Sequence, residues 1–251
     1  MRILALAMAT FVLSGAAALG AGQQPGPSPT VLDGVFTAAQ ADRGLRAYTE
    51  HCSGCHGPDL RGNPVALGLT GTRFIDAWRE DSLSSLFEYM STRMPREPLT
   101  TLPRSVYLDV LTFILQFNGY PAGERELTAD QLKAVQFVDK VGPQPLPNLA
   151  LVRVVGCLTP GEKGAWTLTA TTKPARDSAG RSTTPEELRA SADAALGTGA
   201  FQLQNLEDLP GAPAPQSYSG HKVQAKGALV RGRAGERITV TSLESVASSC
   251  P

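Results

Sequence analysis

The chain has 251 residues, of which 23 are basic and 23 acidic, so its formal net charge at pH 7 is zero. This balance gives no electrostatic attraction to nucleic acid or to an anionic membrane, and it argues against both as partners. The length suits one large or two ordinary domains. The 25 glycines, 19 prolines and 6% aromatic residues favour short elements joined by many turns over a long helical array.

The first 21 residues have the pattern of a secretory signal peptide. Arg2 precedes an apolar run over residues 3–19, and small residues follow at positions 20–22. A basic start, an apolar centre and a small-residue exit are typical of such signals, and we expect cleavage near Ala21. This predicts an exported, periplasmic protein. The alternative is an uncleaved anchor, the one way in which the protein would associate with a membrane.

Residues 22–32 form a flexible tether rich in Pro, Gly, Ser and Gln. A helix is then predicted from Thr37 to about Tyr48, because Thr37 and Gln40 match a capping box. Residues 58–77 contain several glycines and prolines and predict a loop. Apolar residues at helical spacing predict two further helices, one over residues 82–90 and one from Pro103 to Asn118.

A change of pattern follows. Residues 128–138 begin with a second capping box, and residues 141–149 contain three prolines and predict a linker. Beyond the linker, alternating apolar and polar residues predict strands over 150–158, 165–172, 200–206, 221–230 and 237–246. A helix interrupts them after Thr184, where Pro185 and Glu187 supply start signals. The sequence therefore predicts a helical domain over 33–140 and a β-rich domain over 150–251.

The stretch CSGCH places Cys52, Cys55 and His56 together, and such a pair of thiols can form a disulfide, half a zinc site or a haem attachment. Zinc requires four ligands, usually in two pairs, and the remaining cysteines and histidines are single residues. A thioredoxin-like pair belongs in a βαβ unit, whereas this pair follows a helix. Covalent haem uses every residue of the motif: two thioethers to the vinyl groups, and an adjacent imidazole as axial ligand.

Residues 44–62, GLRAYTEHCSGCHGPDLRG, resemble a class I monohaem cytochrome c. In that family a small residue and an aromatic residue of the N-terminal helix cross the C-terminal helix, and Gly44 and Tyr48 match those positions. Residues 107–119 resemble the family's C-terminal helix. The resemblance covers about residues 33–125, and it implies an all-α cytochrome c fold with one covalent haem c, bound through Cys52 and Cys55 and ligated by His56.

The resemblance also implies a methionine as the sixth iron ligand, commonly followed by proline. After the signal segment the chain contains only Met90 and Met94, and Met94 precedes Pro95. Met90 lies on the apolar stripe of its predicted helix, so we expect Met94 to be the ligand, with Met90 or an open site as alternatives. The family's proline in the following loop suggests Pro64 as the carbonyl partner of His56.

Two further cysteines, Cys157 and Cys250, are expected to form a disulfide in an exported protein. The bond would close a loop of roughly 90 residues and contribute about 4 kcal/mol in the loop-entropy model. The surrounding segments resemble the small OB-like β-barrel domains of exported bacterial proteins. This likeness implies no activity, and we expect the domain to be a docking or interaction module.

A thioether that completes the iron coordination raises the reduction potential and blocks small ligands. We therefore expect a periplasmic electron carrier, and not an enzyme, that exchanges electrons with redox partner proteins. The donor would be a dehydrogenase, which the family resemblance suggests is a quinoprotein, with an acceptor downstream. The alternatives are a haem enzyme or gas or redox sensor with a labile sixth ligand, and a binding protein in which haem is incidental.

Overall fold

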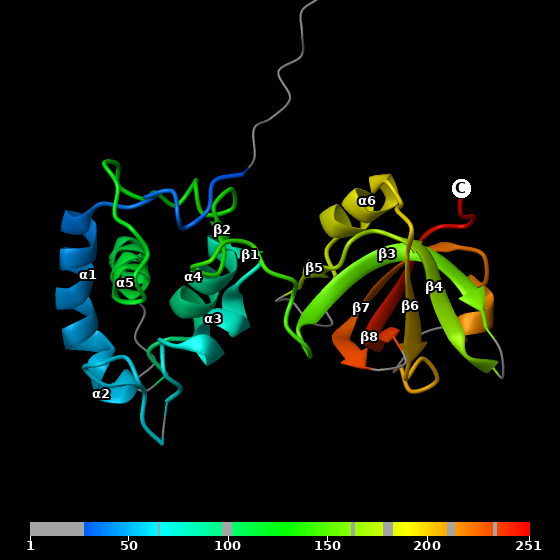
Figure 1. The fold of residues 1–251 in the computed structure, drawn as a ribbon, viewed down its shortest axis with the longest axis horizontal. Helices are drawn as coiled ribbons and strands as arrows, with labels where there is room; N and C mark the ends of the chain where they lie inside the picture. The colour runs from blue at the N-terminus through cyan, green and yellow to red at the C-terminus, as the bar shows by residue number, and fades with distance from the viewer. Residues whose placement is uncertain are drawn as a thin grey trace, which may run out of the picture.

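The computed structural model describes residues 28–64, 66–96, 102–161, 164–177, 183–209, 214–232 and 235–251. A helical lobe lies on one side and a β-rich lobe on the other, joined by the segment near residue 145 (Figure 1). Each lobe has its own hydrophobic core. The predicted signal peptide and the start of the tether lie outside the described residues. Within the described part of the chain, no helix is both long and apolar enough to cross a membrane.

The helical lobe contains the three helices predicted from the sequence and additional short elements. In chain order these are α1 (Ala38–His51), α2 (Ser53–His56), α3 (Thr72–Trp78), β1 (Asp81–Ser82), α4 (Leu83–Arg93), α5 (Arg104–Phe117) and β2 (Gln136–Phe137). The predicted loop over 58–77 is wrong in its last part, which forms α3. This helix has only seven residues, too few to show a period, and it forms because Phe74 and Ile75 are buried in the core.

The start of α1 confirms half of the predicted capping box. The hydroxyl of Thr37 accepts a hydrogen bond from the Gln40 amide at 3.1 Å. The Gln40 side chain does not return to Thr37. Instead its amide group donates to the Leu127 carbonyl at 3.0 Å and accepts from the Leu127 N–H at 2.8 Å. Gln40 is buried, and it ties α1 to the segment that follows α5.

The crossing of α1 and α5 leaves no space for a side chain at Gly44. A Cβ atom at this position would lie 1.9 Å from the carbonyl oxygen of Asp109. One turn later, the ring of Tyr48 packs against that of Phe113, with 5.1 Å between their centroids. The helices therefore cross at the two positions, Gly44 and Tyr48, that the sequence indicated.

Replacing Gly44 with Ala should destabilise the helical lobe by about 1–3 kcal/mol, because the two helix backbones must separate to admit the methyl group. Thermal unfolding of the holoprotein measures the effect. Gly54→Ala is the matched control, since a Cβ there meets nothing within 4 Å. An equal stability of the two variants would contradict the close crossing.

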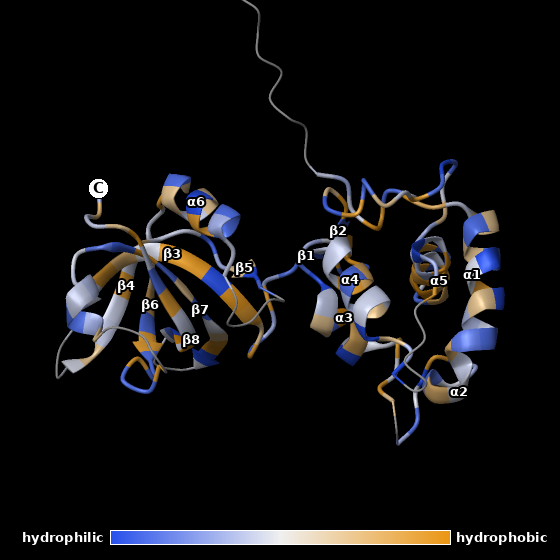
Figure 2. Ribbon diagram, turned by 180° about the vertical axis from the view of Figure 1, so that it is seen from behind, coloured by the Kyte–Doolittle hydropathy of each residue, from blue (hydrophilic) through white to orange (hydrophobic). Residues whose placement is uncertain are grey.

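The β-rich lobe contains the predicted strands and the predicted helix. Its elements are β3 (Leu151–Pro160), β4 (Trp166–Thr171), β5 (Ala175–Arg176), α6 (Pro185–Asp193), β6 (Gly199–Gln204), the 3₁₀ turn η2 (Pro215–Tyr218), β7 (Lys222–Gly232) and β8 (Gly235–Ala247). Strand β3 pairs with both β4 and β7, and the ring closes through β6 and β8. All pairs in the ring are antiparallel except β6 with β8. Figure 2 shows hydrophobic colouring along much of β3, and Val152, Val154 and Leu158 of this strand belong to the core of the lobe.

Helix α6 packs on the outside of this ring, against a row of polar residues of β7. Lys222, Gln224 and Lys226 alternate with the apolar core residues of the strand, so they share its opposite face. The Lys222 ammonium donates to the carbonyls of Ala192 and Ala194 at the end of α6, at 2.5 and 2.8 Å. Gln224 accepts a hydrogen bond from the Ser191 hydroxyl, and Lys226 forms an ion pair with Glu187 of the helix. Polar bonds therefore fix α6 to the sheet.

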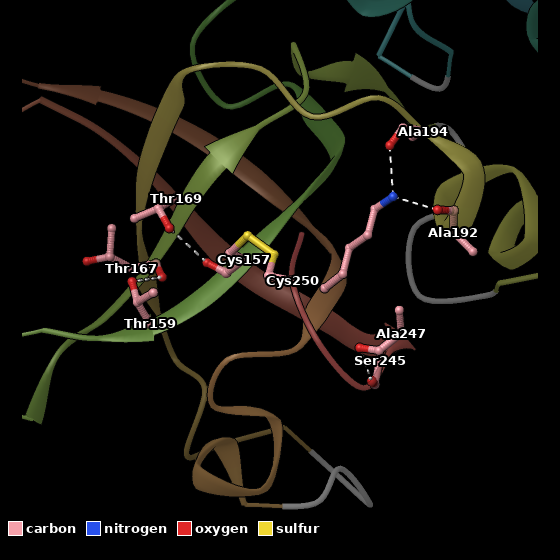
Figure 3. The surroundings of a disulfide bond; sticks show 10 residues. Cys157, Thr159, Thr167, Thr169, Ala192, Ala194, Ser245, Ala247 and Cys250 are labelled. Atoms are coloured by element: carbon pink, nitrogen blue, oxygen red, sulfur yellow. Dashed lines mark hydrogen bonds between the residues drawn. A yellow bond between two sulfur atoms is a disulfide. The ribbon is translucent and has the colours of Figure 1, made fainter.

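A disulfide joins Cys157 of β3 to Cys250, the penultimate residue, which confirms the predicted pair (Figure 3). The Cα atoms lie 5.7 Å apart, and the bond spans 93 residues. It therefore fixes the C-terminal end of the chain to the first strand of the β-rich lobe.

Replacing both Cys157 and Cys250 with Ser should lower the stability of the β-rich lobe by about 4 kcal/mol, because the unfolded chain regains the entropy of an open loop. In calorimetry of the holoprotein, this lobe should unfold at a lower temperature than in the parent. The haem absorption of the helical lobe should stay unchanged at moderate temperature. Reduction of the parent protein should reproduce the shift. No shift under either condition would show that the bond does not form.

The two lobes contact one another directly through Arg176 of β5. Its guanidinium donates to the carbonyls of Asp76, Ala77 and Arg79 at the C-terminal end of α3, at 2.7, 3.2 and 2.6 Å. Carbonyls at a helix C-terminus have no partners within the helix, and they favour a cation. The side chain of Arg79 in turn donates to the Pro145 carbonyl at 2.8 Å. The β-rich lobe is thus bonded to α3 as well as linked through the chain.

Candidate haem site

The CSGCH motif lies in the single turn that follows α1. The Cys52 carbonyl accepts hydrogen bonds from the amides of Cys55 and His56, at 3.2 and 3.0 Å, which closes the short helix α2. Cys52 is partly buried and Cys55 is exposed, and both are free thiols. The structure therefore leaves two unpaired sulfurs one turn apart and does not join them in a disulfide.

Tyr48 connects this turn to the helix crossing. Its hydroxyl donates to the Gly57 carbonyl at 2.5 Å, directly after the motif. Burial raises the pKa of Tyr48 to about 12, so the hydroxyl remains protonated and keeps its role as donor. The motif is thereby held at both ends: by α1 before Cys52 and by Tyr48 after His56.

Burial also raises the pKa of the Cys52 thiol to about 11, with a smaller contribution from Cys55. The site therefore disfavours a charged thiolate at neutral pH. A thioether carries no charge, so a covalent attachment at Cys52 is compatible with this partly buried position.

The orientation of His56 is set by a backbone group. Its Nδ1 lies 2.7 Å from the carbonyl oxygen of Leu67. A carbonyl only accepts hydrogen bonds, so the partner assigns the proton to Nδ1 and leaves the lone pair on Nε2 for a metal. The expectation that Pro64 supplies this carbonyl is wrong. The loop reverses between Asn63 and Ala66, whose backbones bond at 2.9 Å, and this brings Leu67 back toward the motif.

The two candidate methionines differ in their surroundings. Met90 lies within α4 and packs against the core of the helical lobe. Met94 is the first residue after α4, has an extended backbone and is half-buried. Its amide donates to the Met90 carbonyl at 3.1 Å. The position of Met94 outside the helix fits a ligand, and that of Met90 fits a core residue.

The remaining cysteines and histidines have other partners. Cys157 and Cys250 form the disulfide, and Nδ1 of His221 lies 2.9 Å from the hydroxyl oxygen of Ser245. His51 ends α1 and lies 3.7 Å from a carboxylate oxygen of Glu50. Across the residues that the structure describes, no cluster of three or more His, Cys, Asp or Glu side chains could hold a metal ion. A zinc site at CSGCH would therefore lack its second pair of ligands.

The donor set fits haem c. Two free thiols can form thioethers, an imidazole presents Nε2, and a thioether follows on a non-helical segment. The sequence predicted each of these side chains as a candidate ligand or attachment point, and their role stays a prediction. The sequence did not indicate Leu67, because a backbone carbonyl acts irrespective of its side chain and leaves no signal in the residue type.

A protein-family model described as "Cytochrome C oxidase, cbb3-type, subunit III" matches residues 39–114. The match begins in α1, includes CSGCH and ends within α5. A search of curated proteins and a search of solved structures each found no match. Residues 39–114 are therefore a monohaem cytochrome c domain, which implies covalently bound haem c and a role in electron transfer.

Proposed function

We propose that this protein is an exported, periplasmic electron carrier in which Cys52 and Cys55 attach the haem and His56 and Met94 ligate its iron. The bond between His56 Nδ1 and the Leu67 carbonyl carries the proposal, because it prepares Nε2 for the iron beside two free thiols. In this proposal residues 1–21 are the signal peptide, and the cytochrome domain extends over residues 33–140.

When bound, haem supplies reversible one-electron transfer at a potential set by its axial ligands. The chain holds the two proposed iron ligands in place, so that they need not move when the redox state of the iron changes. The Leu67 carbonyl orients the His56 imidazole, and α4 holds the amide of Met94. A Met94 thioether would exclude small ligands from the iron, which favours electron transfer over chemistry on a bound substrate.

The donor in this proposal is a dehydrogenase, with a quinoprotein as the suggested class. The acceptor is a terminal oxidase, which the description of the matched family supports. The β-rich domain over 150–251, reached by the linker 141–149, would dock the carrier to its partner. Its strand ring, with the single parallel pair β6–β8, supports the OB-like assignment.

The covalent attachment is tested by mass spectrometry of the protein made in a host that matures c-type cytochromes. The exported product should carry the mass of one haem, and Cys52→Ser combined with Cys55→Ser should lose it entirely. Cys157→Ser combined with Cys250→Ser is the control and should retain the haem. A colourless parent protein, with the two motif thiols free or bonded to each other, would refute the proposal.

The sixth ligand is tested by the absorption spectrum of the oxidised protein. The parent should show the far-red band that is characteristic of methionine ligation, and Met94→Ala should abolish it and let the reduced protein bind carbon monoxide. Met90→Leu, a volume-conserving change in the core, should keep the band. A parent protein that lacks the band and binds carbon monoxide rapidly would favour the sensor with a labile ligand.

A further inference from the structure

One buried hydroxyl contacts both described ends of the segment between α4 and α5. Tyr107 lies in the first turns of α5 and is 4% exposed. Its hydroxyl donates to the carbonyl of Met94 at 2.6 Å and accepts from the amide of Leu102 at 3.3 Å. The sequence placed Tyr107 only within the helix predicted from Pro103 to Asn118. The structure gives its polar end a specific partner, the backbone of the proposed iron ligand.

Both backbone polar groups of Met94 are thereby bonded within the protein, each to a different helix. The amide donates to Met90 in α4, and the carbonyl accepts from Tyr107 in α5. These two bonds fix the peptide planes on either side of the Met94 Cα atom. They therefore fix the point from which its side chain starts.

Tyr107 also relates Met94 to the CSGCH motif. Its helix, α5, crosses α1 at Gly44, and α1 leads directly to Cys52. The pair of crossed helices therefore holds both parts: α1 leads to the two thiols, and α5 contains Tyr107. Through the Tyr107 hydroxyl, this pair of helices bonds the Met94 backbone.

We propose that Tyr107 is a positioning residue for the sixth iron ligand, and that its hydroxyl sets how readily the Met94 thioether leaves the iron. This inference rests on the proposed ligation by Met94. An external ligand such as imidazole must displace the thioether before it binds oxidised iron. Its apparent affinity therefore scales with the fraction of molecules in which Met94 is released.

The test compares Tyr107→Phe with Tyr120→Phe in the oxidised holoprotein. Tyr120 is also buried, at 2% exposed, and its hydroxyl donates to the Val138 carbonyl at 2.8 Å, so the control removes the same kind of bond to a different backbone carbonyl. Tyr107→Phe should bind imidazole about two- to tenfold more tightly than the parent and weaken the far-red band, which is the range expected for one neutral hydrogen bond. Tyr120→Phe should lose thermal stability while its imidazole affinity stays at the parent value.

The outcomes separate this inference from the function on which it rests. If Met94→Ala keeps the far-red band, the ligation by Met94 is wrong and the role of Tyr107 falls with it. If Met94→Ala loses the band but Tyr107→Phe binds imidazole like Tyr120→Phe, the inference about Tyr107 alone is overturned, and its hydroxyl serves only the stability of the fold.

A second measurement uses the parent protein and covers the case in which Tyr107→Phe does not accumulate. Because Tyr107 bonds both Met94 and Leu102, displacing Met94 with saturating imidazole should speed the hydrogen exchange of the Leu102 amide at least threefold, on the order of the loss of one such bond. Exchange of the Asn118 amide, which donates to Ile114 within α5, should not change. Unchanged exchange at Leu102 would overturn the proposal.

Discussion

The close crossing of α1 and α5 at Gly44 is the constraint on which the cytochrome domain depends. No Cβ fits between the backbones at this point, so the two helices approach until their main chains touch. The packing of Tyr48 on Phe113 fixes the crossing one turn further along, and the Tyr48 hydroxyl reaches the backbone directly after CSGCH. A packing constraint in the helical core thus determines where the two thiols and the imidazole lie.

Backbone carbonyls make many of the bonds that fix side chains, both near the candidate site and between the two lobes. The Leu67 carbonyl orients His56, the Met94 carbonyl receives the Tyr107 hydroxyl, and the last carbonyls of α3 receive the Arg176 guanidinium. Each of these bonds joins segments that are distant along the chain or belong to different elements. They suit an electron carrier, because groups that stay in place when the charge of the iron changes reduce the reorganisation that accompanies each transfer.

The β-rich lobe is stabilised differently from the helical one. Its strand ring encloses an apolar core, yet α6 is fixed outside by charged and polar residues of β7 that are themselves buried. Lys226, at 1% exposed, lies 3.0 Å from Asp177 and 2.8 Å from Glu187, so its charge is compensated. The residue before Asp177 is Arg176, which binds α3. The buried ion pairs therefore lie next to the contact between the lobes along the chain.

The sequence by itself determined the features that depend on residue type and local spacing. CSGCH indicated a candidate haem attachment site, Thr37 and Thr184 began their helices, α5 ended at Asn118, and the alternating strands and the Cys157–Cys250 pair were as predicted. Only the tertiary structure decided that residues 72–78 are helical, that Gln40 bonds Leu127, and that Leu67 rather than Pro64 serves His56. The reason is physical. A short helix forms through burial against distant residues, so its own residues show no helical period. A carbonyl acceptor is present at every position, so residue type does not indicate which one is used.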